Sequence, residues 1–240
     1  MNPKPLTIPS TDDVQVTIHD YGGDGPPIIF CHATGFHGRY WDHVCFPLRE
    51  DFRCISLDFR GHGDTVTPKG TSMRWHGMAE DLLSVLDYFQ FDEVFGVGHS
   101  MGGTSLLLAE ARRKQVFKSL WLFEPIVIPT GPLTEKLSRG NDLARSARKR
   151  RERFPSREDA FQRYASRPPF SGADPGALRS YVDYGFADHE IGEVVLKCRG
   201  EIEAQVFENS ATGLFDLLPE VEVFSKIAGS TDQQGPALLA

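Results

Sequence analysis

The sequence lacks several features that would assign it to a specialised class of protein. It contains no apolar run of the 18 or so residues that a membrane-spanning helix needs. Its first residues, Met1–Pro5, include no apolar segment of the kind found in secretory signals. The four cysteines form no CxxC pair, so neither a zinc knuckle nor a disulfide framework is indicated. We therefore expect buried free thiols and a cytoplasmic location.

An excess of positive charge is also absent. The chain has 26 Lys and Arg against 33 Asp and Glu, which gives a net charge of −7. This balance argues against non-specific binding of nucleic acid by the whole chain. Hydrophobic residues make up 40% and charged residues 25% of the 240 residues, as in an ordinary globular protein. Disorder, collagen and coiled coil are not indicated.

Short apolar runs alternate with helical patterns through the first half of the chain. The apolar runs predict strands at residues 14–18, 27–31, 53–57, 93–97 and 119–123. One helical face is formed by Met78, Leu82, Val85, Leu86 and Phe89, and a second helix is expected over about 101–113. Strand and helix in regular order predict an α/β fold, with a mostly parallel sheet and helices on both faces.

The pattern changes after Phe123. From about Pro125 to Pro219 the sequence is rich in Arg, Pro and charged residues and contains no convincing buried strand. We interpret it as a mostly helical insertion, and expect the sheet to resume at residues 221–224 and run into 227–229. The predicted division is a core of residues 1–126 and 220–240 with a helical cap insertion of residues 127–219.

The strongest chemical motif is Gly98-His99-Ser100-Met101-Gly102, which follows an apolar strand and opens a helix. A tight turn at this place pushes the serine Oγ clear of the sheet, and its glycines have no Cβ to collide across the turn. The helix N-terminus, with the Met101 N–H, faces any oxyanion that develops there. The alternative is an ordinary glycine-rich turn with a capping serine.

This segment resembles the nucleophile elbow of the α/β-hydrolase fold family, serine-nucleophile branch with a helical cap. His32-Ala33-Thr34-Gly35-Phe36 resembles the family's oxyanion loop, and Asp58-Phe59-Arg60-Gly61-His62-Gly63 resembles its structural D-x-R-G-x-G turn. The resemblance covers residues 10–125 and 221–240. It implies Ser100 as the nucleophile and the N–H groups of Met101 and Thr34 as the oxyanion hole.

A serine nucleophile also needs a base and an orienting acid. The resemblance offers two acids: Asp232, three residues after Gly229, and Glu124, at the end of the strand that follows the elbow helix. Each is alternatively a structural carboxylate. The family's histidine comes after the acid, but the last histidine of this chain is His189. We expect a C-terminally incomplete fold, truncated by roughly 40 residues on ordinary element lengths, and assign no base.

The reaction class follows from the residue at the elbow. Family members that open epoxides or displace halide use a carboxylate there, whereas a serine favours acyl transfer through an acyl-enzyme. We predict a serine hydrolase, esterase-like, acting on a small carbonyl substrate, most simply a carboxylic ester. The activity of this chain is expected to be impaired. Neither a metal nor an organic cofactor is implied, and neither a membrane nor a nucleic acid is expected as partner.

Aromatic side chains after the oxyanion loop are candidates for an acyl pocket. Phe36 and Trp41, together with His99, are predicted to bind substrate, and the alternative for the aromatics is packing of the helix that starts near Gly38. Two rival functions stay open. One is a non-catalytic protein that binds a small molecule on this fold. The other is an interaction module acting through a basic run over 145–157, which is more simply a solvated cap helix.

Overall fold

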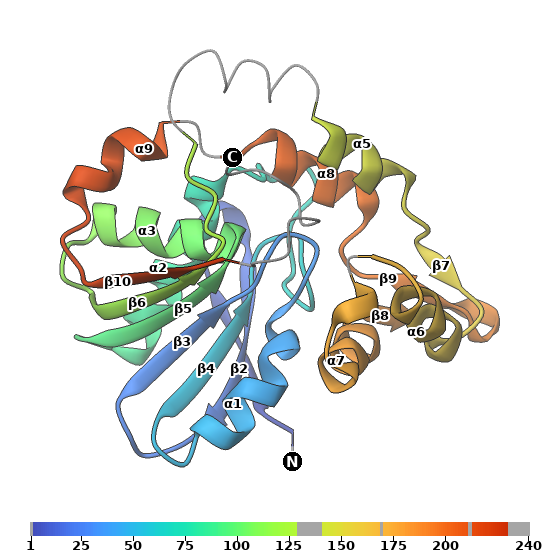
Figure 1. Cartoon of the computed structure of the whole chain (residues 1–240), viewed down its shortest axis with the longest axis horizontal. Helices are drawn as coiled ribbons and strands as arrows, with labels where there is room; N and C mark the ends of the chain where they lie inside the picture. The colour runs from blue at the N-terminus through green and yellow to red at the C-terminus, as the bar shows by residue number, and fades with distance from the viewer. Residues whose placement is uncertain (1, 129–140, 169, 211–212, 230–240) are drawn as a thin grey trace.

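The computed structural model describes residues 2–128, 141–168, 170–210 and 213–229 (Figure 1). Within these residues the main sheet has seven strands in the order β1-β2-β4-β3-β5-β6-β10. The strands are β1 (Lys4–Pro9), β2 (Gln15–Gly22), β3 (Pro27–Cys31), β4 (Arg53–Asp58), β5 (Val94–His99), β6 (Phe117–Phe123) and β10 (Ser225–Ala228). β1 and β2 are antiparallel to their neighbours, and the other five strands run parallel. The predicted mostly parallel sheet is confirmed.

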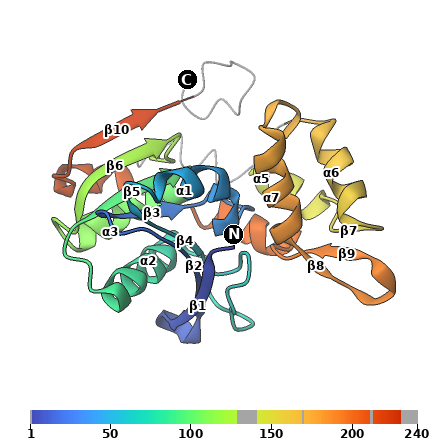
Figure 2. The same ribbon diagram turned by 90° about the horizontal axis from the view of Figure 1, so that it is seen from below.

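Helices cover both faces of this sheet, as predicted (Figure 2). One face carries α2 (Trp75–Phe89) and α3 (Met101–Arg112), and the other carries a 3₁₀ turn (Gly38–Trp41) followed by α1 (Asp42–Leu48). The apolar face predicted for α2 is buried, with Met78, Leu82, Val85 and Leu86 each at most 1% exposed. The central strands are buried on both faces, which explains their continuous apolar runs.

The segment between β6 and β10 forms a separate group of elements beside the sheet (Figure 1). It contains α5 (Asp142–Lys149), β7 (Arg153–Phe154), α6 (Arg157–Ala165), a 3₁₀ turn (Phe170–Gly172), α7 (Pro175–Gly185), β8 (Phe186–Asp188), a 3₁₀ turn (Glu190–Gly192), β9 (Val194–Leu196) and α8 (Gly200–Glu208). The segment has four helices of 8–11 residues, but it also has a feature that the sequence did not indicate, since β7, β9 and β8 form a three-stranded antiparallel sheet. Strands of two or three residues are too short to produce an alternating pattern.

The chain returns to the main sheet through α9 (Leu214–Leu217) and a 3₁₀ turn (Leu218–Glu220). Leu214 is buried in the main core. The expected strand at 221–224 is displaced, since β10 begins only at Ser225 and pairs with β6. Val221 and Val223 instead pack against the core from irregular chain, so their apolar character reflects burial and not strand structure.

Candidate active site

Ser100 lies at the sharp turn between β5 and α3, as its motif predicts. Its backbone has φ 52° and ψ −117°, a conformation that residues with a side chain rarely adopt. Its N–H donates to the carbonyl of Phe123 at 2.9 Å, and the N–H and hydroxyl of Thr104 donate to its carbonyl at 3.0 and 3.2 Å. These bonds hold the strained turn, and the serine side chain stays half-buried at the start of α3.

The glycines of the motif permit two close backbone contacts. A Cβ at Gly98 would lie 2.6 Å from Cα of Gly103, and a Cβ at Gly102 would lie 2.7 Å from the carbonyl oxygen of His32. Real Cβ atoms essentially never show contacts under 3.0 Å, so only glycine lets α3 pack this tightly. The N-terminus of α3 therefore touches the chain that leaves β3 and enters the predicted oxyanion loop.

Two buried histidines hold that loop in place. The Phe59 N–H donates to Nε2 of His32 at 3.1 Å, so Nδ1 of this ring carries the proton and donates to the carbonyl of Ala33 at 2.8 Å. The Gly35 N–H donates to Nε2 of His62 at 3.1 Å. Burial lowers the pKa of His62 to about 4 and that of His32 well below 6.5. Both rings are therefore neutral at pH 7, as accepting an N–H requires.

The two predicted oxyanion donors lie on these neighbouring segments. Met101 is the first residue of α3, and the first N–H groups of a helix have no partner within it. Thr34 is buried in the turn closed by the Phe36 N–H on the carbonyl of Ala33. Its hydroxyl has no hydrogen-bond partner among the described residues. The arrangement suits a negatively charged oxygen near Ser100.

One of the two predicted acids lies beside the elbow. β5 and β6 are neighbours with His99 opposite Phe123, so Ser100 and Glu124 each directly follow a paired strand residue. Glu124 has φ 47°, a second strained residue at this edge. Burial lowers the pKa of His99, and the nearby charge of Glu124 acts in the opposite direction. The other candidate, Asp232, lies outside the described residues.

Two further buried histidines, His19 and His37, take part in structural contacts. His19 pairs with the buried carboxylate of Asp58 at 3.2 Å, and Nε2 of His37 donates to the carbonyl of Tyr181 at 3.1 Å. Burial alone would raise the pKa of Asp58, but His19, His37 and the Asp64 N–H hold it below its usual value. This carboxylate also accepts the Gly38 N–H at 2.6 Å, which supports the structural role predicted for the D-x-R-G-x-G turn.

The predicted substrate-binding aromatics separate into two environments. The Phe36 ring lies 6.1 Å from His99 and within 5.6 Å of Tyr40, Phe170 and Tyr181 (centroid distances). Phe36 and His99 thus belong to one aromatic cluster next to the serine. The ring centroid of Trp41 instead lies 5.5 Å from that of Phe30 in the small core under α1. Trp41 therefore has the packing role that was the alternative to substrate binding.

The insertion contains a partly buried cluster of polar side chains that was not predicted from the sequence. The guanidinium of Arg150 forms an ion pair with Glu203 and donates to the hydroxyls of Tyr164 and Tyr181, both at 2.9 Å. Burial alone would lower the pKa of Arg150, but Tyr181, Glu203 and Tyr164 hold it above the usual value. In the sequence Arg150 is one of several basic residues, and nothing there distinguishes it from its neighbours.

Most of the predicted basic run is neutralised within the chain. Arg148 of α5 pairs with Glu201 at 2.8 Å and Glu208 at 2.6 Å, both on α8. Arg153 lies 3.8 Å from Glu193, and Arg157 pairs with Asp188. These pairs join α5 to α8 and α6 to the small sheet, as expected of a solvated cap helix.

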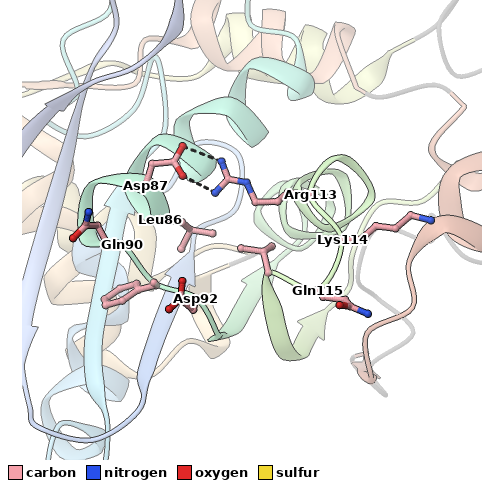
Figure 3. A pocket seen from close by; sticks show the side chains of 9 residues that line it. Leu86, Asp87, Gln90, Asp92, Arg113, Lys114 and Gln115 are labelled. Atoms are coloured by element: carbon pink, nitrogen blue, oxygen red, sulfur yellow. Dashed lines mark hydrogen bonds and ion pairs between the residues drawn. The ribbon is translucent and has the colours of Figure 1, made fainter.

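A hollow of about 420 Å³ lies at the opposite end of the parallel strands from Ser100. It is lined by residues at the ends of α2 and α3, where Arg113 pairs with Asp87 (Figure 3). Ligands of open parallel sheets bind at the carboxyl ends of the strands, so this hollow is not the candidate site. Among the described residues, no three His, Cys, Asp or Glu are grouped to hold a metal ion, and no helix is long and apolar enough to cross a membrane.

Comparison with known proteins gives one family model and several relatives. The model, described as the alpha/beta hydrolase family, matches residues 28–218. The chain is 37% identical to epoxide hydrolase 2 of Siraitia grosvenorii over 82 residues, which are 33% of this chain and 26% of that protein. It is 33% identical to the bifunctional esterase/perhydrolase DCH of Acinetobacter calcoaceticus over 108 residues, 44% of this chain and 38% of that protein. The matches thus span about a third of these relatives.

The structure resembles that of E-2-(acetamidomethylene)succinate hydrolase with a TM-score of 0.74. The match covers 95% of this chain and 91% of that chain at 16% identity. An identity this low shows the fold alone. Together with the family model, it confirms the predicted fold class.

Proposed function

This chain belongs to the alpha/beta hydrolase family, and from that premise we propose that it hydrolyses a small carbonyl substrate, most simply a carboxylic ester, with Ser100 as nucleophile. The single observation that carries the proposal is the geometry of the elbow. A serine with φ 52° stands at the N-terminus of α3, and Gly102 holds that helix against the start of the loop that contains Thr34.

In the proposed reaction the Ser100 Oγ attacks the substrate carbonyl carbon. The carbonyl oxygen becomes an oxyanion, which accepts hydrogen bonds from the N–H groups of Met101 and Thr34. The proton of the serine hydroxyl passes to the departing alkoxide oxygen, which leaves as the alcohol and breaks the ester C–O bond. An acyl-enzyme remains, and water then releases the acid and restores the serine hydroxyl. A serine at this position favours acyl transfer over epoxide opening, so the esterase is a better guide to the chemistry than the epoxide hydrolase.

The aromatic cluster supplies the apolar side of the proposed site. His99 directly precedes Ser100, Phe36 lies 6.1 Å from the His99 ring, and Phe170 packs on Phe36 from the insertion. We propose that Phe36, His99 and Phe170 contact the acyl group of a small apolar ester, while Tyr181, which is 1% exposed, packs behind them. The four cysteines are buried free thiols, and we retain the proposal of a cytoplasmic location.

We propose Asp232 or Glu124 as the orienting acid and assign no base. No histidine follows His189 in the sequence, and the buried histidines near the loop already bind backbone groups. The loss of one triad member lowers turnover by several orders of magnitude. We therefore expect the 240-residue chain to turn over esters slowly.

An organophosphonate label with mass-spectrometric readout tests the nucleophile. We expect slow labelling of Ser100 in the wild-type chain and none in Ser100→Ala. Ser105→Ala is a matched control, because Ser105 is a buried serine of the same helix whose hydroxyl bonds the Met101 carbonyl. Labelling of a residue other than Ser100, or equal labelling of Ser100→Ala, refutes the assignment.

The lack of an assigned base favours one alternative, a non-catalytic protein that binds a small molecule at this site. Such a protein is stabilised by ester-like ligands but shows no label on Ser100. Thermal unfolding with and without a non-hydrolysable ester analogue, run beside the labelling experiment, distinguishes the two functions.

A further inference from the structure

The partly buried ion pair between Arg150 and Glu203 in the insertion lies directly against the predicted oxyanion loop. The side chains of Arg150 and Glu203 are 17% and 12% exposed. A Cβ at Gly35 would lie 2.7 Å from Oε1 of Glu203 and 3.4 Å from Nη1 of Arg150. Gly35 also has φ 79°, in the left-handed region that favours glycine. The loop conformation therefore favours glycine here, and the absence of a side chain lets the ion pair approach the loop closely.

One tyrosine connects this ion pair to the loop by a hydrogen bond. Nitrogens of an arginine only donate, so the Tyr181 hydroxyl accepts from Arg150 and keeps its own proton free. That proton is donated to the carbonyl of Gly35 at 3.3 Å. Tyr164 accepts an equal bond from Arg150, but among the described residues its hydroxyl makes no bond to the loop.

The loop is held from the core side as well. The Gly35 N–H donates to His62, and the Phe36 N–H closes the turn on Ala33. Thr34, the proposed oxyanion donor, occupies the middle of this turn directly before Gly35. The turn is thus fixed by the core at the Gly35 N–H and by the insertion at the Gly35 carbonyl. A buried ion pair contributes little net stability, whereas a fully bonded polar network fixes one geometry.

From this arrangement we infer that Tyr181, Arg150 and Glu203 are positioning residues, which orient the oxyanion loop from the insertion. Arg150 and Glu203 hold the Tyr181 hydroxyl, and this hydroxyl holds the Gly35 carbonyl, so the turn that carries the Thr34 N–H is held in one geometry. The inference rests on the proposed function only in treating the loop as an oxyanion hole. The packing of the insertion against the loop then fixes the geometry of the proposed oxyanion hole.

Two variants that each remove one oxygen test this inference. Tyr181→Phe removes the bond from Arg150 and the bond to Gly35, whereas Tyr164→Phe removes only a bond from Arg150. We measure amide exchange of Gly35 relative to amides of α3, so that any change in global stability cancels. The exchange of Gly35 is expected to be about fivefold faster in Tyr181→Phe, as the loss of one hydrogen bond produces, and unchanged in Tyr164→Phe.

Binding of phenylboronic acid, which forms a tetrahedral adduct with a reactive serine, adds a functional readout. We expect about fivefold weaker binding to Tyr181→Phe than to Tyr164→Phe. Equal Gly35 exchange in the two variants, or equal boronate affinity, overturns the inference. If the wild-type chain binds no boronate, the proposed function fails for this chain, and the exchange of Gly35 still decides whether Tyr181 positions the loop.

Discussion

The close contact between α3 and the chain leaving β3 can be tested by replacing a glycine with alanine. In such a variant the helix propensity of alanine stabilises the protein, whereas the contact of the new Cβ destabilises it. Gly102 and Gly103 are adjacent in the first turn of α3, and helix propensity favours alanine at either by at most about 1 kcal/mol. At Gly102 the new Cβ would lie 2.7 Å from the His32 carbonyl oxygen and closer still to that of Cys31. Backbone atoms cannot rotate away, so α3 must shift.

Overpacking of this kind costs about 1–3 kcal/mol. Because several backbone atoms lie this close, the cost should be at the upper end, and we expect Gly102→Ala to lower the free energy of unfolding by about 2 kcal/mol after the propensity gain. At Gly103 the nearest atom to a new Cβ is Cβ of Pro125 at 3.1 Å, which needs only a small adjustment. Gly103→Ala, the matched control, should stay within about 1 kcal/mol of the wild type.

Urea unfolding followed by circular dichroism measures both variants, with the midpoint and the slope fitted separately. The shift of α3 in Gly102→Ala also moves the Met101 N–H, so labelling of Ser100 should fall in this variant and persist in Gly103→Ala. Equal stability of the two alanine variants, or a Gly102→Ala chain as stable as the wild type, would show that the close contact is wrong.

Two further predictions concern ionisable groups. Burial lowers the pKa of His37 and His62 from 6.5 to about 4. The unfolded chain takes up a proton on each as pH falls from about 6.5, while the native chain resists until about 4, so stability should decrease over this range by on the order of 3 kcal/mol per histidine. A flat unfolding midpoint between pH 7 and 4 would contradict these shifts. Arg150→Met leaves the partly buried carboxylate of Glu203 unpaired and should cost up to about 3 kcal/mol in urea unfolding. The control Arg148→Met removes exposed ion pairs and should change the midpoint little; a larger effect from Arg148 than from Arg150 would reverse our ranking.

The parts of the fold that the sequence predicts are those whose signal lies in consecutive residues. The buried strands β3, β4 and β5 carry continuous apolar runs, and α2 carries a 3.6-residue pattern. The elbow at Ser100 is also local, because glycines on both sides are needed wherever such a turn occurs. β1 was not predicted: its burial alternates weakly, and most of its residues are exposed at the sheet edge.

The insertion is the part that sequence reasoning described least well. Its small sheet has strands of two or three residues, which leave no periodic pattern. Its basic residues look alike in sequence, yet Arg148 pairs with exposed glutamates, whereas Arg150 pairs with the partly buried Glu203. The side a residue faces in a short, irregular segment depends on what packs over it, and local sequence does not record that.

By itself the sequence determined the alternation of strands and helices, the elbow and the identity of the residue that stands on it. These features depend on neighbouring residues, whose conformational preferences act whatever the rest of the chain does. Only the tertiary structure decided that the N-terminus of α3 meets the loop after β3, and that Arg150 and Glu203, 53 residues apart, meet over Gly35. Such contacts join distant segments, so no stretch of neighbouring residues records them. They depend on the absence of a side chain at Gly102 and Gly35 and on the pairing of opposite charges brought out of water.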